Sequence, residues 1–155
     1  MRKILSFFTV ISVALALSGC VKNTSCKAKT VESEDAEMLA YASTVGMTPT
    51  RHSSGMYYQI LNQGSGPAPT YSSLLYVRYT GKLLNGTVFD SATTTPISFN
   101  LGGVIMGWQI GLSLLQKGGV IRLIIPSSLA YGCRDNGSIK ANSILYFDVE
   151  LVDVQ

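Results

Sequence analysis

The stretch "SILYFDVELV" (residues 143–152) decides the fold class, because its side chains alternate in polarity. Four apolar residues at alternate positions share one face of an extended strand: Leu145, Phe147, Val149 and Leu151. Asp148 and Glu150 take the opposite face. This alternation is typical of an antiparallel sheet that has one face on the core and the other in water.

Other segments extend the predicted sheet. Strand patterns rich in β-branched and aromatic residues cover residues 55–61, 72–81, 96–101 and 119–125. Asn85-Gly86 is a strong turn signal between two strands. We therefore expect a sheet of about five strands.

A helix is predicted between the last strands, in "GWQIGLSLLQKGG" (residues 107–119). Trp108, Leu112 and Leu115 follow helical spacing, and Gly118 supplies a stop. One short helix inside a curved antiparallel sheet is an α+β architecture. Trp108, the only tryptophan, falls in the first turn, where it either packs in the core or faces a mouth between helix and sheet.

The N-terminal sequence has the pattern of a signal peptide. A basic start at Arg2 and Lys3 precedes an uncharged apolar run over residues 4–17. The end of this segment, "LSGC" (residues 17–20), resembles the bacterial lipobox, in which the cysteine is acylated and becomes the first mature residue. An ordinary secretory signal with a chance cysteine is the alternative.

We accordingly expect residues 1–19 to be removed and Cys20 to carry a lipid that holds the protein to a membrane. The predicted location is the extracytoplasmic side of a bacterial membrane, in the cell envelope. Residues 20–53 are predicted to form a lipid-anchored tether with a short helix over residues 34–44 that Ser33 caps. The folded domain is expected to span residues 54–155.

Charge argues against a nucleic-acid partner. The chain has 12 Lys and Arg against 9 Asp and Glu, and loss of Arg2 and Lys3 leaves a net charge of +1. No basic cluster with interleaved aromatic residues remains.

Cysteine and histidine usage predicts neither a metal site nor a cofactor. The sequence has no CxxC pair, and its sole histidine, His52, has no ligand-spaced neighbour. A disulfide between Cys26 and Cys133 is one alternative, because the predicted compartment is oxidising. Because Cys26 falls in the predicted tether, we expect Cys133 to be free.

Four segments together resemble the FKBP-type peptidyl-prolyl cis-trans isomerases. They are "YVRYTGKLLNGTVFDSA" (76–92), "GVIMGWQIGL" (103–112), "LAYGCRDNGSI" (129–139) and "LYFDVELVDV" (145–154). The resemblance covers about residues 54–155. With the lipobox, it points to the envelope lipoprotein branch of that family.

The resemblance implies a prolyl pocket with Trp108 as its floor and glycines that clear space above it. The catalytic positions it implies are Tyr79, Phe89, Asp90, Trp108, Tyr131 and Phe147. The substrate-binding positions it implies are Ile97, Val104, Ile105 and Ile139. In this picture the Ile105 N–H and the Tyr131 hydroxyl bond substrate carbonyls, while Asp90 pairs with the Tyr79 hydroxyl.

The implied activity is isomerisation of X–Pro bonds in unfolded or nascent exported polypeptides, without cofactor. Macrolides of the rapamycin or tacrolimus type are possible ligands by resemblance. The alternative is a noncatalytic FKBP-like module that binds or holds extended segments. The loop at residues 91–99 lacks the family's rim arginine, and Lys140-Ala141 replaces its usual proline pair. We expect these departures to affect substrate preference and macrolide affinity more than catalysis.

Overall fold

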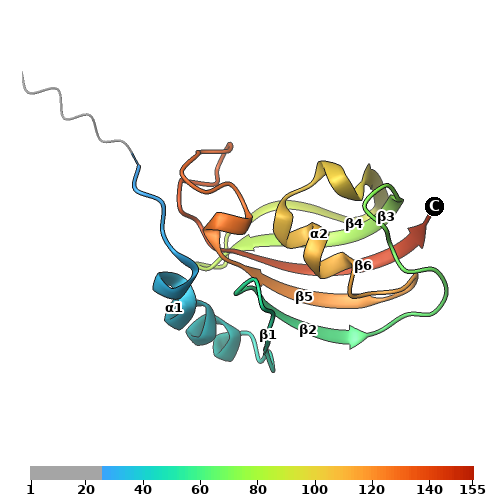
Figure 1. Cartoon of the computed structure of the whole chain (residues 1–155), viewed down its shortest axis with the longest axis horizontal. Coiled ribbons are helices and arrows are strands. Elements are labelled where there is room, and N and C mark those ends of the chain that lie inside the picture. The colour runs from blue at the N-terminus through green and yellow to red at the C-terminus, as the bar shows by residue number, and fades with distance from the viewer. Residues whose placement is uncertain (1–25) are drawn as a thin grey trace, which may run out of the picture.

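Six antiparallel strands form one sheet, in the order β1-β2-β5-β6-β3-β4, in the computed structural model, which describes residues 26–155 (Figure 1). The strands are β1 (Thr50–Arg51), β2 (Tyr57–Asn62), β3 (Leu74–Leu83), β4 (Val88–Asn100), β5 (Val120–Ile125) and β6 (Leu145–Val154). The helices are α1 (Val31–Thr44) and α2 (Met106–Leu112), with short 3-10 turns η1 (Leu101–Gly103) and η2 (Ser127–Leu129). The predicted α+β class is confirmed, and Cys20 lies outside the described residues.

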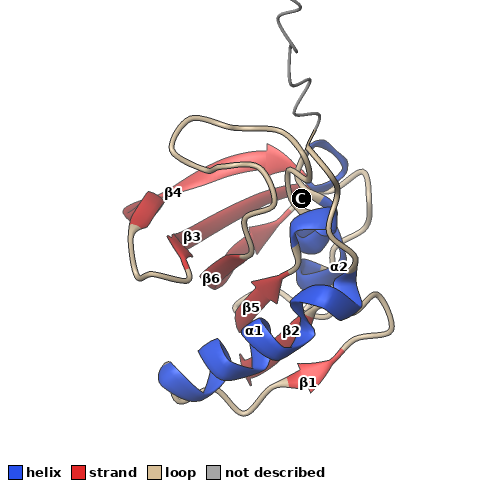
Figure 2. Cartoon of the chain, turned by 90° about the vertical axis from the view of Figure 1, so that its left-hand side faces the viewer, coloured by secondary structure: helices blue, strands red, loops and turns tan. Residues whose placement is uncertain are grey.

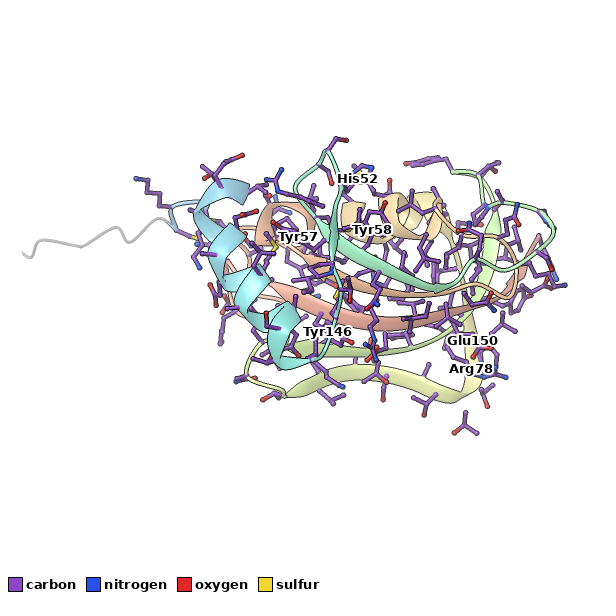
Figure 3. All side chains as sticks on the ribbon, turned by 90° about the horizontal axis from the view of Figure 1, so that it is seen from below. His52, Tyr57, Tyr58, Arg78, Tyr146 and Glu150 are labelled. Carbon is purple, nitrogen blue, oxygen red and sulfur yellow. A yellow bond between two sulfur atoms is a disulfide. The ribbon has the colours of Figure 1, made fainter. Side chains whose placement is uncertain are left out.

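The alternation in β6 builds the main core. Leu145, Phe147, Val149 and Leu151 are all at most 4% exposed and belong to one apolar cluster with Trp108, Leu112 and alternate residues of β5. The polar residues between them face outward. Figure 3 shows Arg78 of β3 beside Glu150 of β6, and Arg78 Nη1 lies 3.1 Å from Glu150 Oε2. The sheet therefore has an apolar face under α2 and a charged face, as the alternation predicts.

The charged face is covered at one end by α1. Ile124 of β5 and Tyr146 of β6 point away from the main core and pack in a second apolar cluster with Met38 and Ala42 of α1. Successive strand residues face opposite sides of a sheet, so α1 and α2 lie on different faces (Figure 2). Among residues 26–155 no helix is long and apolar enough to cross a membrane.

β4 is longer than the predicted strand 96–101, because it begins directly after the Asn85-Gly86 turn. Within residues 26–155 it pairs only with β3, with a shift in register: Val77 lies opposite Ile97, whereas Tyr79 lies opposite Ala92. The extra residues 93–96 therefore bulge from the edge of the sheet. The predicted turn is confirmed, since Asn85 Oδ1 accepts the Thr87 N–H at 3.0 Å.

The helix ends differ from those predicted. α1 begins at Val31, one turn early, because Thr30 and not Ser33 is its cap: Thr30 Oγ1 accepts the Ser33 N–H at 3.3 Å. α2 ends at Leu112, before Gly118. The next segment bonds instead to the β2–β3 connection, since the Gln116 N–H donates to Gln63 O at 2.9 Å. Such long-range bonds are not visible in a helical pattern.

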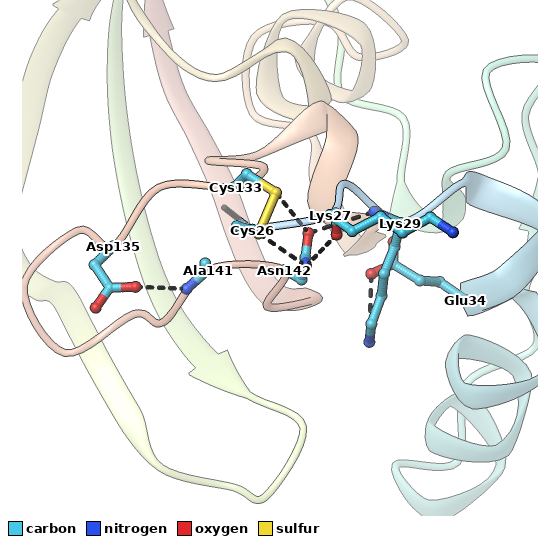
Figure 4. The surroundings of a disulfide bond; sticks show 8 residues. All are labelled: Cys26, Lys27, Lys29, Glu34, Cys133, Asp135, Ala141 and Asn142. Carbon is cyan, nitrogen blue, oxygen red and sulfur yellow. Dashed lines mark hydrogen bonds and ion pairs between the residues drawn. A yellow bond between two sulfur atoms is a disulfide. The ribbon is translucent and has the colours of Figure 1, made fainter. Parts of the chain in front are cut away.

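The expectation of a free Cys133 is wrong. Cys26 and Cys133 form a disulfide with a Cα–Cα distance of 5.5 Å across a sequence separation of 107 (Figure 4). The pair meets because α1 packs on the sheet and carries the segment before it to the connection between β5 and β6. β1, which falls in the predicted tether, also pairs with β2. From Cys26 onward, the segment predicted as a tether is thus attached to the folded domain.

Candidate functional site

A pocket of about 390 Å³ opens between α2 and the strands β3, β4 and β6. Its wall is mostly aromatic and aliphatic, with Asp90 as the one ionisable carboxyl group. The lining residues are Tyr79, Phe89, Asp90, Ile97, Phe99, Gly103, Val104, Ile105, Trp108, Tyr131 and Phe147. A concave, apolar pocket with few polar groups is the usual form of a small-ligand or peptide-side-chain site.

Trp108 forms the floor of this pocket. Its ring meets Tyr79 edge to face at 5.1 Å between centroids and Phe147 at 5.2 Å, and Phe99 lies 5.3 Å away. Edge-to-face contacts are favourable for aromatic rings, so each partner helps fix the indole. Trp108 is only 5% exposed and belongs to the main core as well as to the pocket. The two interpretations of this residue that periodicity left open are therefore both correct.

Two of the glycines near Trp108 lie on the side of α2 that faces β5 and not on the side of the pocket. A Cβ at Gly107 would lie 2.4 Å from Ile125 Cγ2, and one at Gly111 would lie 2.6 Å from Leu123 Cδ2. These two glycines therefore let α2 approach β5 closely. Only Gly103 lines the pocket, so the expectation that the glycines clear space above the tryptophan holds for that position alone.

Tyr79 and Asp90 supply a polar contact inside the aromatic wall. The Tyr79 hydroxyl donates to Asp90 Oδ2 at 2.5 Å. Burial and then the bond to Asp90 raise the pKa of Tyr79 above its ordinary value. The phenol is a neutral donor at physiological pH, and its hydrogen bond fixes the Asp90 carboxyl group in the pocket wall.

The rim is more exposed than the floor. Ile97 of β4 is 41% exposed and Tyr131, just after η2, is 36% exposed. Ile105 is the N-cap of α2, a position whose N–H has no partner within the helix. The rim thus offers apolar surface together with a hydroxyl and a backbone donor.

The structure brings together all the predicted pocket positions except one. Ile139 does not line the pocket but is 4% exposed within the main core. Phe99 and Gly103 line the pocket and were not predicted as site residues. Phe99 had a usable signal, because it lies two residues after Ile97 on the same predicted strand and so shares its face.

The indole N–H of Trp108, at the pocket floor, is buried and lacks a hydrogen-bond partner among the described residues. Asp90 is held by Tyr79 rather than by a histidine or lysine. This arrangement suits desolvation and hydrogen bonding of a bound group better than proton transfer or covalent catalysis.

Comparison with known proteins identifies a family with similar sequences. The model of the FKBP-type peptidyl-prolyl cis-trans isomerase domain matches residues 66–152. The FKBP-type peptidyl-prolyl cis-trans isomerase FkpA of Escherichia coli is 48% identical over 105 residues, which are 66% of this chain and 39% of that protein. The chain therefore spans about two fifths of the length of this relative.

Solved structures are similar in fold. The crystal structure of FkpA from Escherichia coli matches with a TM-score of 0.72 and 40% identity, over 81% of this chain and 61% of that chain. A peptidyl-prolyl cis-trans isomerase from Pseudomonas syringae pv. tomato matches with a TM-score of 0.68 and 30% identity, over 84% and 99% of the two chains.

Proposed function

The chain belongs to the FKBP-type peptidyl-prolyl cis-trans isomerase family, and we propose that it catalyses cis–trans isomerisation of X–Pro bonds in the pocket above Trp108. The observation that carries this proposal is the hydrogen bond from the Tyr79 hydroxyl to Asp90 Oδ2, which is 2.5 Å long and lies in an aromatic wall. A pocket that only bound proline rings would need the apolar wall but no hydrogen-bonded carboxyl group.

The chemistry of the reaction fits such a pocket. Rotation about an X–Pro bond breaks amide resonance against a barrier of about 18–20 kcal/mol. The twisted amide is less polar than the planar one, so a site that excludes water favours it. A thousandfold acceleration requires about 4 kcal/mol of this preference, which desolvation and one or two hydrogen bonds can supply.

Particular residues take particular roles in this proposal. The proline ring lies on Trp108 between Tyr79 and Phe147, and Phe89 closes the wall. The Ile105 N–H and the Tyr131 hydroxyl donate to carbonyl groups of the peptide. Asp90, oriented by Tyr79, acts on the amide as it twists. Ile97 and Val104 contact the residues beside the proline.

We also propose that the protein works in the cell envelope on unfolded exported polypeptides. The support is the signal-like sequence before Cys20 and the Cys26–Cys133 disulfide, a bond that is characteristic of oxidising compartments. Acylation of Cys20 would then hold the domain at the membrane surface. Macrolides that mimic a prolyl group are proposed ligands of the same pocket.

The test is refolding of a protein whose slow step is proline isomerisation, with the chain from residue 21 onward, which retains Cys26. The proposed function predicts faster refolding in proportion to the amount of chain added, and slower refolding with Asp90→Leu. If the chain binds proline peptides without accelerating refolding, it is a binding module.

A further inference from the structure

Glu34 is a buried acidic residue on the face of α1 that packs against the rest of the domain. It follows the helical spacing of Met38 and Ala42, and these three are the buried residues of α1. Its side chain is 0% exposed. Burying a carboxyl group is costly unless it is bonded, so a helix that needed only to pack on the sheet would be better served by an apolar residue here.

The partner of Glu34 is a loop that leads to the pocket. Glu34 Oε2 accepts the Ser127 N–H at 2.8 Å, across 93 residues of sequence. Ser127 begins η2, and its own carbonyl accepts the Ala130 N–H at 3.0 Å and the Gly132 N–H at 2.8 Å. Tyr131, on the pocket rim, lies between these two donors in sequence. The position of Ser127 therefore determines the turn that presents Tyr131.

The other end of the same turn is also held from the N-terminal side. Cys133, two residues after Tyr131, is bonded to Cys26. Asn142, whose N–H donates to Gly132 O at 2.7 Å, donates through its side chain to Lys27 O at 2.9 Å. Figure 4 shows the Cys26–Cys133 disulfide and the contact between Asn142 and Lys27 side by side. The segment 26–34 thus contacts the loop on both sides of Tyr131.

This segment lies outside the part of the chain that the family model matches, residues 66–152. We infer that residues 26–34 hold the rim of the pocket in place, and that Glu34 is a positioning residue that fixes Tyr131 through Ser127. The inference rests on the proposed function for its kinetic consequence, although the positioning itself is a property of the structure. Its basis is the buried Glu34–Ser127 bond together with the second attachment at Cys133.

The contacts of the two Glu34 carboxyl oxygens decide which substitutions test the inference. Glu34 Oε1 has no hydrogen-bond partner among residues 26–155, and its nearest cation is Lys29 Nζ at 3.9 Å. Only Oε2 holds the loop, so an oxygen acceptor at this point is the essential feature. Glutamine supplies that acceptor, whereas alanine leaves the buried Ser127 N–H without a partner.

The experiment compares kcat/KM for an X–Pro peptide among variants of the disulfide-bonded chain from residue 21 onward. We expect Glu34→Ala to lower kcat/KM about fivefold to tenfold, and Glu34→Gln to restore most of it. The matched control is Asp35→Ala. Asp35 neighbours Glu34 on α1 but bonds the Tyr57 hydroxyl at 2.9 Å and Arg51 Nε at 3.1 Å, away from the loop. This control should leave kcat/KM unchanged even where it lowers the melting temperature.

A double-mutant cycle identifies the route of the effect. If Glu34 acts through Tyr131, Glu34→Ala in a Tyr131→Ala background should cause no further loss of kcat/KM. Additive losses in the double variant would overturn the inference, as would Glu34→Ala with wild-type kcat/KM.

Hydrogen exchange separates this inference from the proposed function. Amides of residues 127–133 should exchange at least about tenfold faster in Glu34→Ala than in Asp35→Ala or the wild type. If the wild type proves inactive, the proposed function fails and this measurement alone decides the positioning role. Unchanged exchange in that segment would then contradict it.

Discussion

The floor and the rim of the pocket are built in different ways. The floor residues Trp108, Tyr79 and Phe147 are each at most 8% exposed and belong to the main core, so the forces that fold the sheet also fix them. The rim residue Tyr131 is 36% exposed and sits on a loop held by a disulfide and by Glu34. The floor therefore depends on the packing of the family domain, whereas this part of the rim depends on residues that precede that domain.

Removing the disulfide should have the largest effect on stability. The bond closes a loop across a sequence separation of 107, and a loop of that size contributes about 2–5 kcal/mol to the free energy of unfolding. The double variant Cys26→Ser with Cys133→Ser should lose that amount in urea unfolding. Because the floor packs independently of the bond, the native fluorescence of Trp108 should not change.

A reduced wild type serves as the control and should match the double variant. An unfolding midpoint equal to that of the oxidised protein would show that the bond adds nothing to the fold. A shifted native fluorescence would show that floor and rim are not separate.

Replacing Asp90 tests the floor directly. Asp90→Leu keeps the branched shape of the side chain but removes the carboxyl group and leaves the Tyr79 hydroxyl without its acceptor. We expect kcat/KM for an X–Pro peptide to fall about 30- to 100-fold, equivalent to about 2–3 kcal/mol of transition-state stabilisation. Peptide affinity should change much less. An equal loss of affinity and rate would assign Asp90 a binding role only.

The floor was the more predictable of the two regions. Alternation in residues 143–152 placed Phe147 on the core face, and helical spacing placed Trp108 with Leu112. Both signals are local, because a strand repeats every two residues and a helix about every 3.6. The resemblance to the isomerase family then assigned these positions to a pocket, and the structure brings them together.

The rim could not be derived in the same way. The Cys26–Cys133 bond depends on where α1 docks, which no local pattern states. Glu34 did carry a weak signal, since it shares the spacing of Met38 and Ala42, but an isolated acidic residue on a short helix usually faces solvent. The bulge at residues 93–96 and the early end of α2 likewise depend on long-range hydrogen bonds.

A rim substitution should have a smaller effect than one at the floor. Ile97 is 41% exposed and lines the pocket edge, so Ile97→Ala removes little buried surface. We expect KM to rise about twofold to fivefold with kcat unchanged, because the side chain contacts a residue beside the proline and does so equally for the planar and the twisted amide. A series of peptides that differ before the proline measures this, and a large fall in kcat would contradict the division between floor and rim.

The smallest expected effect is that of pH on stability between about pH 6 and 9. Burial and the bond to Asp90 raise the pKa of Tyr79, and burial and the bond to Asp148 raise that of Tyr146. Below the ordinary tyrosine pKa of about 10 both phenols are neutral in the folded and unfolded chains, so they add no slope. Above about pH 10 the unfolded chain loses these protons first, and stability should fall as pH rises.

Urea unfolding at a series of pH values measures this slope. Tyr79→Phe should flatten the alkaline part of the curve. A wild-type stability that does not fall above pH 10 would contradict the assignment of these buried phenols.

The proposed pocket accelerates rotation of the X–Pro amide and does not merely bind the peptide. NMR exchange spectroscopy on a short X–Pro peptide reports the cis–trans exchange rate and, through line broadening, the binding of the same peptide. With the chain from residue 21 onward in catalytic amount, we predict exchange at least about a hundredfold faster than in the free peptide, and a much smaller increase with Asp90→Leu. If the wild type binds the peptide but leaves its exchange rate equal to that of the free peptide, the pocket is a binding site and not a catalytic one.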